Sequence, residues 1–338
     1  MNLPKVTDLD VVNKKVLVRV DLDIDVGENY RLHAILPTLK YLSSKSSKII
    51  LIGHRGRPEG KVVDELKMKP VEEELRKIAE GIEFEMLENL RFDPGEEKND
   101  LEFTQKLASL GDAYVNEAFG NSHREHASIV GLPKLLPHAA GIRFIEEVNN
   151  LSKVFDNPKR PVLFIVGGSK RDKLDYIEDL KKVADKILVG GRLPDYMGDN
   201  TVSVRSLDEG QKMIVANLIM DKEDITIHSI EKFEEEISKA SSDDVKKSGT
   251  IVLAGPMGKY EDNGHRQGTE RIFKAVAASN AFKITGGGDS LSVLSIYNLK
   301  DKFDWVSVGG GAMLEFLAKR TLPGIKALES ANVSGEGG

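Results

Sequence analysis

The chain has 338 residues, of which 40% are hydrophobic and 30% charged, a composition typical of a globular protein with about two domains. Its net charge of −6 and its pI near 5.8 exclude a general electrostatic attraction to nucleic acid or to anionic membranes. The chain contains no cysteine, which excludes disulfides, thiolate metal sites and cysteine nucleophiles, and its apolar runs are too short to span a membrane.

Short apolar segments that predict β-strands recur along the whole chain. Most are continuously apolar rather than alternating, which is typical of strands buried on both faces of a parallel sheet. Helical patterns lie between them, as at residues 70–80, where Val71, Leu75 and Ile78 share one face. Strands alternating with helices indicate an α/β fold. The predicted strands are residues 15–22, 48–54, 112–119, 160–168, 186–191, 202–207, 250–255, 282–287 and 305–311.

A predicted helix divides the chain near its middle. Residues 142–160 keep a helical periodicity through Phe155 and then break at Asn157-Pro158, immediately before a new strand. We therefore expect two α/β domains joined by a helix. The expected limits are 1–142 for the N-terminal domain, 143–159 for the linker helix and 160–321 for the C-terminal domain.

Several strands of the C-terminal half end in glycine where a helix begins. Examples are "FIVGGSKRDKLDYI" (164–177), "FKITGGGDSLSVL" (282–294) and "VSVGGGAMLEFLAKR" (306–320). Glycine at the carboxyl end of a parallel strand lets backbone N–H groups approach a ligand, and the helix that follows adds partial positive charge. A single turn of this kind is more often only a tight connection. Their repetition indicates cradles for phosphate groups.

Charged residues accompany these turns, although the common nucleotide motifs are missing. Neither G-x-G-x-x-G nor G-x-x-x-x-G-K-[ST] occurs. Lys170 and Lys173 follow the first glycine pair and suit the neutralisation of phosphate charge. Asp289, after the second glycine triplet, could hold a magnesium ion on a nucleotide phosphate.

The strand ends of the N-terminal half carry arginine and histidine instead of glycine. Guanidinium groups at several strand ends suit a small substrate with several anionic groups, whereas one such arginine alone is more often part of a surface ion pair. His123 and His126 lack a third ligand and do not indicate a metal site. The candidate residues are Asp21, Asp23, Arg31, His54, Arg55, Arg57, Arg91, His123, Arg124 and His126.

Taken together, these motifs resemble the phosphoglycerate kinase family nearly from end to end. "VLVRVDLDIDV" is similar to the family's "VLVRVDFNVP", "GHRGRPEGK" to "SHLGRPKGK" and "ENLRFDPGEEKND" to "ENLRFHPGEEKND". "YVNEAFGNSHREHASIVGLP" is similar to "YVNDAFGTAHRAHASTVGI", and "RPVLFIVGGSK" to "RPFLAILGGAK". The later motifs "GPMGKYE", "ITGGGDS" and "VSVGGGAMLEFLAKRTLPGIKAL" follow in the family's order.

The resemblance implies two Rossmann-like three-layer α/β domains with parallel sheets, joined by an interdomain helix, with the tail at residues 322–338 returning to the N-terminal domain. It implies reversible phosphoryl transfer between 1,3-bisphosphoglycerate and ADP, giving 3-phosphoglycerate and ATP, in line and after domain closure. The positions that match the family's acid-substrate residues are Asp21, Asp23, Arg31, His54, Arg57, Arg91 and Arg124.

The resemblance places the nucleotide in the C-terminal domain. Arg31 and Lys173 would clamp the transferring group from opposite sides, with Lys170, Gly309 and Gly310 as further catalytic groups. Mg²⁺ would be the cofactor, held by Asp289 through the nucleotide phosphates. The matching nucleotide positions are Gly167, Gly168, Lys170, Lys173, Gly190, Gly191, Pro256, Glu261, Gly288, Asp289 and Ser290.

The same reasoning yields expectations about partners and location. The partners would be the two small-molecule substrates. Members of the family are usually monomers, so the resemblance implies a monomer here. The N-terminus has no signal-peptide pattern, so we expect a cytoplasmic protein that binds neither nucleic acid nor membranes.

The sequence also departs from the family. Asp23 stands where the family has asparagine, Arg192 replaces the third glycine of a GGG turn, and Ala254 replaces the asparagine before Gly-Pro. The lysine loop "GGSKRDK" is one residue short, so Leu174 would take the place of the second lysine if no gap were placed there. The chain is also shorter than the family norm.

These departures leave an alternative open. A non-catalytic, nucleotide-binding homologue could serve as a regulatory or interaction protein, and a phosphoglycerate-dependent rate would exclude it. An NAD-dependent dehydrogenase shares the α/β pattern but would need the missing fingerprint. The sequence leaves the choice between ATP and GTP, the physiological direction and the extent of activity open.

Overall fold

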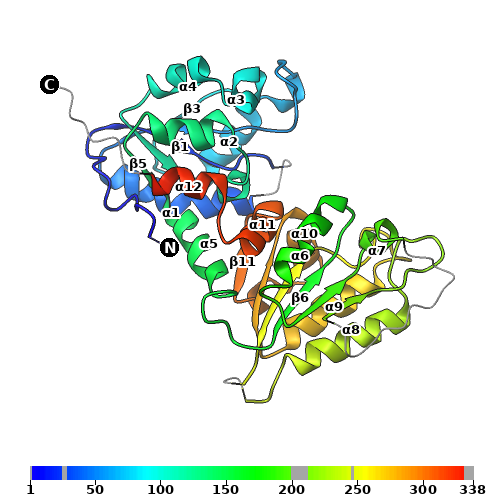
Figure 1. Ribbon diagram of the computed structural model, residues 1–338. Helices are drawn as coiled ribbons and strands as arrows, with labels where there is room; N and C mark the ends of the chain where they lie inside the picture. The colour runs from blue at the N-terminus through cyan, green and yellow to red at the C-terminus, as the bar shows by residue number, and fades with distance from the viewer. Residues whose placement is uncertain (1, 25–28, 199–211, 245–246, 331–338) are drawn as a thin grey trace. The chain divides into compact units, whose positions relative to one another are not determined.

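The computed structural model describes residues 2–24, 29–198, 212–244 and 247–330, and Figure 1 shows its helices and strands. The chain divides into two compact units. We call Met1–Asn149 with Thr321–Gly338 the N-terminal unit and Asn150–Arg320 the C-terminal unit. Among the residues described, every helix is too short or too polar to cross a membrane.

The described part of the N-terminal unit is built on a parallel sheet in the order β3-β2-β1-β4-β5. Val18 of β1 pairs with Leu51 on one side and with Val115 on the other. The order reverses between β1 and β4, which leaves a crevice at the carboxyl ends of these strands. The strands are β1 (Lys15–Arg19), β2 (Lys48–Ile52), β3 (Phe84–Met86), β4 (Ala113–Asn116) and β5 (His138–Ala140).

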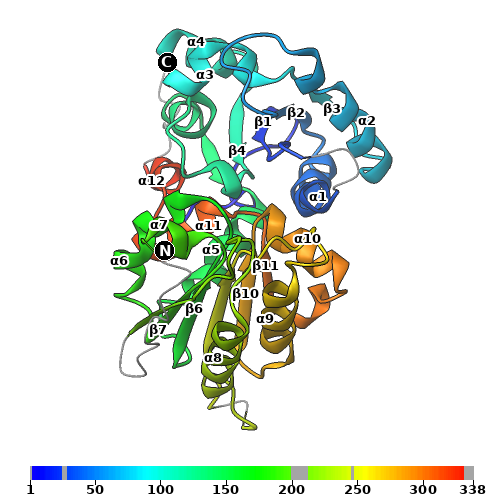
Figure 2. The ribbon, with the colours of Figure 1, turned by 90° about the vertical axis from the view of Figure 1, so that its right-hand side faces the viewer.

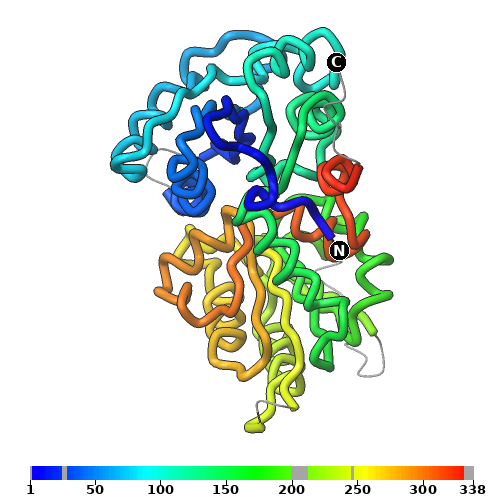
Figure 3. The backbone as a smooth tube through the Cα atoms, turned by 90° about the vertical axis from the view of Figure 1, so that its left-hand side faces the viewer, coloured from blue at the N-terminus to red at the C-terminus, as the bar shows by residue number. Residues whose placement is uncertain are grey.

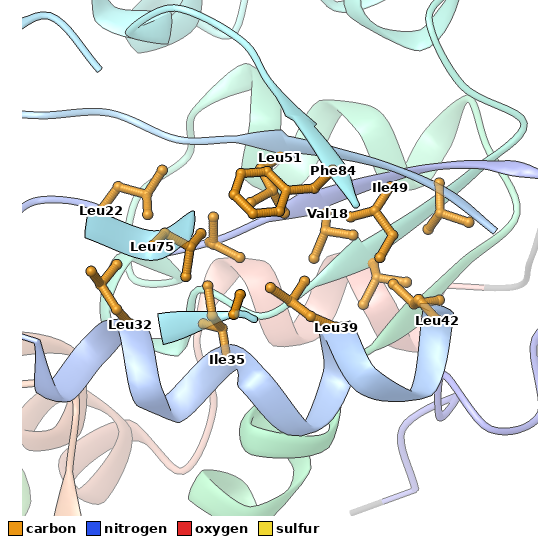
Figure 4. Packing of buried hydrophobic residues seen from close by; sticks show 14 of the residues in the cluster. Val18, Leu22, Leu32, Ile35, Leu39, Leu42, Ile49, Leu51, Leu75 and Phe84 are labelled. Atoms are coloured by element: carbon orange, nitrogen blue, oxygen red, sulfur yellow. The ribbon is translucent and has the colours of Figure 1, made fainter. Parts of the chain in front are cut away.

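Two helices, α1 (Tyr30–Ser44) and α2 (Lys69–Ile78), cover one face of this sheet with apolar side chains. Figure 4 shows the residues of α1 directed towards Val18, Ile49 and Leu51 of the strands, with Leu75 of α2 in the same layer. The residues of α1 recur at helical spacing and are buried, namely Leu32, Ile35, Leu39 and Leu42.

Alternate strand residues point to the opposite face, towards the π-helical turn Ala127–Gly131. Arg19 Nε donates to Ser128 Oγ at 2.8 Å, and the Tyr114 hydroxyl donates to the Ser128 carbonyl oxygen at 2.7 Å. The helices α3 (Pro94–Lys98) and α4 (Leu101–Ala108) pack against this turn. Both faces of the sheet are therefore covered, which gives three layers.

The last described helix, α12 (Pro323–Glu329), belongs to the N-terminal unit. Figure 3 shows its red segment beside the turn Ala127–Gly131, and Gly324 N donates to the Ser122 carbonyl oxygen at 2.8 Å. The expected tail continues to residue 338, but residues 331–338 lie outside the described part of the chain.

The described part of the C-terminal unit is built on a second parallel sheet in the order β11-β10-β9-β6-β7-β8. The order reverses between β6 and β9, so its crevice lies at their carboxyl ends. The strands are β6 (Val162–Val166), β7 (Lys186–Val189), β8 (Met213–Val215), β9 (Thr250–Ala254), β10 (Phe282–Gly286) and β11 (Trp305–Ser307).

Helices follow the strands of this second sheet. Figure 2 shows α8 and α9 side by side against it, and the two helices contact each other. The described helices of the unit are α6 (Ile177–Leu180), α7 (Leu193–Tyr196), α8 (Ile227–Lys239), α9 (Gln267–Ala278), α10 (Gly288–Ile296) and α11 (Gly311–Lys319).

The helix α5 (Ile142–Ser152) carries the chain from the first unit into the second. The buried carboxylate of Glu117 caps its beginning, because its two oxygens accept from Arg143 N at 3.0 Å and from Phe144 N at 2.9 Å. The helix ends at Ser152, before the predicted Phe155, and the chain turns through Asn157 in the left-handed region with φ 57°.

The predicted α/β fold with two parallel sheets is confirmed. Three strands, β3, β5 and β8, were not predicted; each has only three residues at an edge of its sheet and, unlike the equally short edge strand β11, none leads into a glycine triplet. The segment 202–207 lies outside the described residues. The other predicted strands coincide with β1, β2, β4, β6, β7, β9, β10 and β11.

Truncating Leu39, which is 0% exposed between α1 and the sheet, tests this packing. We expect Leu39→Ala to lower the free energy of unfolding of the N-terminal unit by about 2–5 kcal/mol, through lost burial and the cavity left behind. Urea denaturation followed by circular dichroism measures the change. Val62→Ala is the control, because Val62 is 69% exposed. Equal effects of the two substitutions would contradict the packing of α1 on the sheet.

Candidate functional site

Acidic and basic side chains meet at the carboxyl end of β1 in the N-terminal unit. Asp21 is buried, and its Oδ2 lies 3.6 Å from Nε of Arg31, in the first turn of α1. Arg31 Nη1 also donates to the carbonyl oxygen of Asp23. The Asp23 carboxylate accepts from Gly56 N at 2.8 Å, in the loop after β2. These bonds join the ends of two neighbouring strands to the start of α1.

A group of charged side chains, which we call the cationic cluster, lies behind this loop. We define it as Arg19, Arg91 and Arg124, whose charges all act on His54 and His126. Arg91 is 1% exposed, and its Nη1 donates to the Gly56 carbonyl oxygen at 2.6 Å. Its Nη2, like Nε of Arg124, is buried and makes no hydrogen bond with any residue that the structure describes. Oxygens of an anionic ligand would satisfy such donors.

The two histidines beside the cationic cluster, His54 and His126, resist protonation. Burial lowers the pKa of His54 well below its ordinary value, and the charges of Arg19, Arg91 and Arg124 lower it further. Burial lowers the pKa of His126 to about 3, with the same arginines as the next cause. Glu96 Oε1 lies 3.8 Å from His126 Nδ1, too far to outweigh these effects. The positive charge of this region is therefore carried by the arginines, of which Arg91 pairs with Glu97 (Nε to Oε1 3.1 Å).

Arg57 lies apart from the cationic cluster, whereas Arg19 belongs to it. Arg57 is exposed, and among the described contacts none connects it to the cationic cluster, so its assignment to the acid substrate stays a prediction. Arg19 was not singled out, although an arginine inside the apolar run "KVLVRVDL" (15–22) was a signal that could have found it. A charged residue in a strand buried on both faces requires a specific partner.

The C-terminal unit contains a cavity of about 510 Å³ at the carboxyl edge of its sheet. The loops after β6, β7, β8 and β9 and the start of α10 contribute to it, as expected for the ligand crevice of a doubly wound sheet. Its lining residues are Gly168, Ser169, Gly191, Arg192, Glu223, Pro256, Gly258, Lys259, Tyr260, Glu261 and Asp289.

Lys173 places its ammonium group at the ends of two central strands. Nζ donates to the carbonyl oxygens of Gly167 at 2.6 Å and of Ala254 at 3.0 Å, after β6 and at the end of β9. Burial lowers its pKa to about 8, while the charge of Asp289 opposes this shift. Lys173 thus reaches the ends of both strands despite the short loop, and its match to the family's second lysine stays a prediction.

Two glycines make room for that ammonium group. Gly168 and Gly255 have φ values of 95° and 107°, and a Cβ atom on them would lie 2.9 Å and 2.6 Å from Lys173 Nζ. The positive φ disfavours any side chain at both positions, and at Gly255 a Cβ atom would also lie 2.7 Å from the Gly167 carbonyl oxygen. The glycine turns therefore shape a site around the half-buried Lys173.

The two later glycine triplets meet at the starts of α10 and α11. A Cβ atom on Gly287 would lie 2.9 Å from the Cα atom of Gly310, so the two turns touch through their backbones. Both helices direct their N-terminal N–H groups to this edge of the sheet. The buried Ser290 hydroxyl, in the first turn of α10, has no hydrogen-bond partner within the described chain. This arrangement suits phosphate oxygens.

The remaining predicted nucleotide residues surround the cavity without lining it. Lys170 is exposed beside the first glycine turn, Gly190 is buried after β7, and Gly288 begins α10. Glu223, Lys259 and Tyr260 line the cavity but were not predicted. Glu223 follows β8, which the sequence did not indicate, so its approach to Lys259 (Oε2 to Nζ 3.6 Å) had no local signal.

The residues present suit a magnesium ion that a nucleotide carries. Asp289 is an exposed carboxylate that lines the cavity. Within the described ranges, no group of three or more His, Asp or Glu side chains could hold a metal ion alone. Mg²⁺ is commonly bound through one or two carboxylates together with substrate phosphates.

Comparison with known proteins gives one consistent family. The sequence profile described as Phosphoglycerate kinase matches residues 6–224 and 195–320. The chain is 35% identical to the phosphoglycerate kinase of Finegoldia magna and 36% identical to that of Buchnera aphidicola. These alignments cover 97% of this chain and 100% and 99% of the two relatives. The first runs over 393 positions, more than the 338 residues here, so this chain lacks segments of its relative.

Solved structures give the same result. The phosphoglycerate kinase from Coxiella burnetii has a TM-score of 0.75 and 28% identity, covering 97% of this chain and 99% of that one. The phosphoglycerate kinase from Pyrococcus horikoshii has a TM-score of 0.76 and 26% identity, covering 96% and 98%. The similarity therefore extends over both units of the chain.

The neutral state of His126 predicts how stability depends on pH. Unfolded, this histidine binds a proton below its ordinary pKa of 6.5, whereas the folded protein binds it only near pH 3. Stability therefore falls as the pH is lowered through that window. We expect His126→Gln to reduce the loss between about pH 7 and pH 5 by about 1–2 kcal/mol.

Urea denaturation at several pH values measures this dependence. His33→Gln serves as the matched control, because His33 is an exposed histidine of α1 in the same unit. If the free energy of unfolding of His126→Gln depended on pH as steeply as that of the wild type, the cationic cluster would not keep a proton off His126.

Proposed function

This chain belongs to the phosphoglycerate kinase family, and on that premise we propose how its residues divide the reaction between the two units. The enzyme transfers a phosphoryl group reversibly between 1,3-bisphosphoglycerate and ADP, giving 3-phosphoglycerate and ATP. The full-length match to named phosphoglycerate kinases carries this conclusion. It disfavours a non-catalytic homologue and excludes an NAD-dependent dehydrogenase.

The N-terminal unit binds the acid substrate in this proposal. Asp21, Asp23, Arg31, His54, Arg57, Arg91 and Arg124 are the assigned residues. The support is chemical: the cationic cluster presents buried guanidinium donors of Arg91 and Arg124 without protein acceptors, and guanidinium groups match phosphate and carboxylate oxygens. An anion also relieves the repulsion among the arginines, which adds to affinity.

The C-terminal unit binds the nucleotide. The phosphates of the nucleotide lie against the glycine turns and the starts of α10 and α11, where the backbone at Gly310 and the Ser290 hydroxyl supply donors. Gly309 keeps its assignment as part of this turn, although its own N–H donates to Ser307 Oγ at 3.1 Å. Glu261 and Pro256 line the same cavity for the rest of the nucleotide. The other assigned positions are Gly167, Gly168, Lys170, Lys173, Gly190, Gly191, Gly288 and Asp289.

Mg²⁺ accompanies the nucleotide in this proposal and is held by Asp289. When bound, it neutralises phosphate charge that the protein would otherwise have to meet alone. Lys170 contributes a mobile positive charge at the mouth of the site, since its side chain is exposed.

Transfer requires positioning and charge stabilisation rather than covalent help from the protein. Arg31 approaches the transferring group from the acid side and Lys173 from the nucleotide side. Since these residues belong to different units, the two units must close on their ligands before transfer. Closure also excludes water, which would otherwise accept the phosphoryl group.

The assignment of one substrate to each unit leads to our proposals for the domain limits, the oligomeric state and the location. The N-terminal domain of residues 1–142 and the C-terminal domain of residues 160–321 are the substrate-binding modules, with residues 143–159 as linker and residues 322–338 returning to the first. We propose a monomer, because each assigned group comes from this one chain. We also propose a cytoplasmic location, where the two small-molecule substrates are available.

Replacing Arg31 tests the catalytic clamp. We expect Arg31→Ala to lower kcat/KM for 3-phosphoglycerate by about 10²–10³-fold, because one charge is lost from the transition state. A coupled assay of 3-phosphoglycerate phosphorylation by magnesium ATP measures the rate. Arg76→Ala is the control, since Arg76 pairs with Glu72 on the surface of α2. The absence of any rate in the folded wild-type protein would contradict the proposed function.

The lowered pKa of Lys173 predicts a pH limit for nucleotide use. A lysine is charged below its pKa, so kcat/KM for ATP is expected to fall as the pH rises through about 8. Bound phosphates favour the charged form, so kcat itself falls only at higher pH. Rate measurements from about pH 7 to pH 9.5 test this expectation.

Two variants complete that pH experiment. We expect Lys173→Met to lose most of its kcat/KM for ATP and, with it, the fall of kcat/KM at alkaline pH. Lys182→Met is the control, because Lys182 is an exposed partner of Asp179, and it should keep both the wild-type kcat/KM and its fall at alkaline pH. A flat wild-type profile of kcat/KM over this range would show that the Lys173 charge is not required.

A further inference from the structure

Arg19 is a fully buried, charged residue that is not among the residues proposed to bind a ligand. Arg19 is 0% exposed and His54 is 2% exposed. Each guanidinium nitrogen donates a hydrogen bond within the protein: Nε to Ser128 Oγ at 2.8 Å, Nη1 to the Val20 carbonyl oxygen, and Nη2 to His54 Nδ1 at 2.9 Å. A group held at three points cannot turn towards a ligand. Its effect on the site must therefore pass through a neighbour.

The bond to His54 determines which ring nitrogen carries the proton. Arginine has five N–H donors and no acceptor, so His54 Nδ1 has to accept. The neutral imidazole then carries its single proton on Nε2. A second proton would have to enter Nδ1 against the N–H of Arg19, in a buried place that Arg91 and Arg124 also make positive. One tautomer of a neutral ring is thus selected.

The other end of Arg19 is anchored by a buried carboxylate. Ser128 Oγ donates to Glu96 Oε1 at 2.6 Å, and Ser128 N donates to Glu96 Oε2 at 3.0 Å. Because the serine proton points to Glu96, the hydroxyl oxygen is left to accept from Arg19 Nε. The donors therefore run in one direction through Ser128 to Glu96, which is 0% exposed and lies in α3.

We propose that Arg19 is a positioning residue that holds His54 as its Nε2–H tautomer, so that a neutral histidine donates a hydrogen bond to an oxygen of the acid substrate. The inference rests on the proposed function only for the identity of that ligand. Nε2 lies 3.9 Å from Asp23 Oδ2, farther than a hydrogen bond reaches, in the crevice where the ligand is assigned. A neutral N–H adds direction to a site in which the arginines already supply charge.

The ring nitrogens of His54 report the tautomer directly. Long-range ¹H–¹⁵N correlation spectra of the labelled full chain give the protonation of each ring nitrogen, and His54→Gln identifies its signals among the 7 histidines. We expect a protonated Nε2 and an unprotonated Nδ1 in the wild type, and a mixture of tautomers in Arg19→Met. A protonated Nδ1 in the wild type, or an unchanged tautomer in Arg19→Met, overturns the inference.

Ligand addition tests the second half of the inference. 3-Phosphoglycerate should shift the Nε2 signal of the wild type, and the absence of a shift overturns a direct bond to that ligand. Arg19→Met should raise KM for 3-phosphoglycerate about tenfold or more while KM for ATP stays unchanged, since one hydrogen bond to a charged ligand is misdirected. Arg76→Met on α2 is the matched control and should change neither constant.

A milder variant keeps the test decisive if Arg19→Met does not fold. Ser128→Ala removes the acceptor of Arg19 Nε and should produce part of the same tautomer mixture; a single unchanged tautomer there overturns the anchoring by Ser128. An inactive wild type with the expected tautomer and the expected ligand shift would contradict the proposed function and support this inference. The two failures are thereby distinguishable.

Discussion

Burial of both faces of each parallel sheet is the constraint on which the rest of this protein depends. In the N-terminal unit, α1 and α2 fill one face with apolar side chains, and the turn Ala127–Gly131 covers the other. The second face admits Arg19 and Tyr114 because their polar groups have partners: Ser128 accepts a hydrogen bond from each, and Arg19 also donates to the Val20 carbonyl oxygen and to His54 Nδ1. Most other charged residues of the candidate sites lie in the loops or helix starts that follow the strands, whereas Asn116 of β4 and Thr285 of β10 are further polar residues within strands. Both candidate sites lie at such an edge, each within its own unit.

The two units use different kinds of positively charged or hydrogen-bond-donating groups at their proposed anion-binding sites. The N-terminal unit fixes guanidinium groups in a buried cluster and keeps its histidines neutral, so positive charge is concentrated on Arg91 and Arg124 beside Arg19. The C-terminal unit relies on backbone N–H groups at the starts of α10 and α11 and on the ammonium group of the half-buried Lys173. Both arrangements cost stability in the absence of ligand, through repulsion in one case and desolvation in the other. Such costs are typical of sites that are organised before the ligand arrives.

The departures from the family pattern have local structural partners. Lys173 reaches the ends of β6 and β9 although its loop is one residue short, because Gly168 and Gly255 leave space for its Nζ. Ala254 takes part through its carbonyl oxygen, which any residue supplies. The carboxylate of Asp23 is engaged by Gly56 N at 2.8 Å, which offsets part of its charge near an anionic ligand. These contacts give three of the departing positions partners within their own unit.

Local patterns in the sequence determined the α/β class, most of the strands and the positions of the glycine turns, because burial on two faces and close backbone approach leave marks within a few residues. They also determined the family. The edge strands β3, β5 and β8 left no such mark, since each is only three residues long and none leads into a glycine triplet, as the equally short edge strand β11 does. Only the tertiary structure revealed the hydrogen bond between Arg19 and His54. Arg19 can be buried there because Ser128, which accepts from its Nε, lies 109 residues farther along the chain, beyond the reach of any local pattern. The tertiary structure likewise brought Glu223 to Lys259 and left Arg57 at the surface, since packing between distant segments sets a side chain's neighbours and exposure.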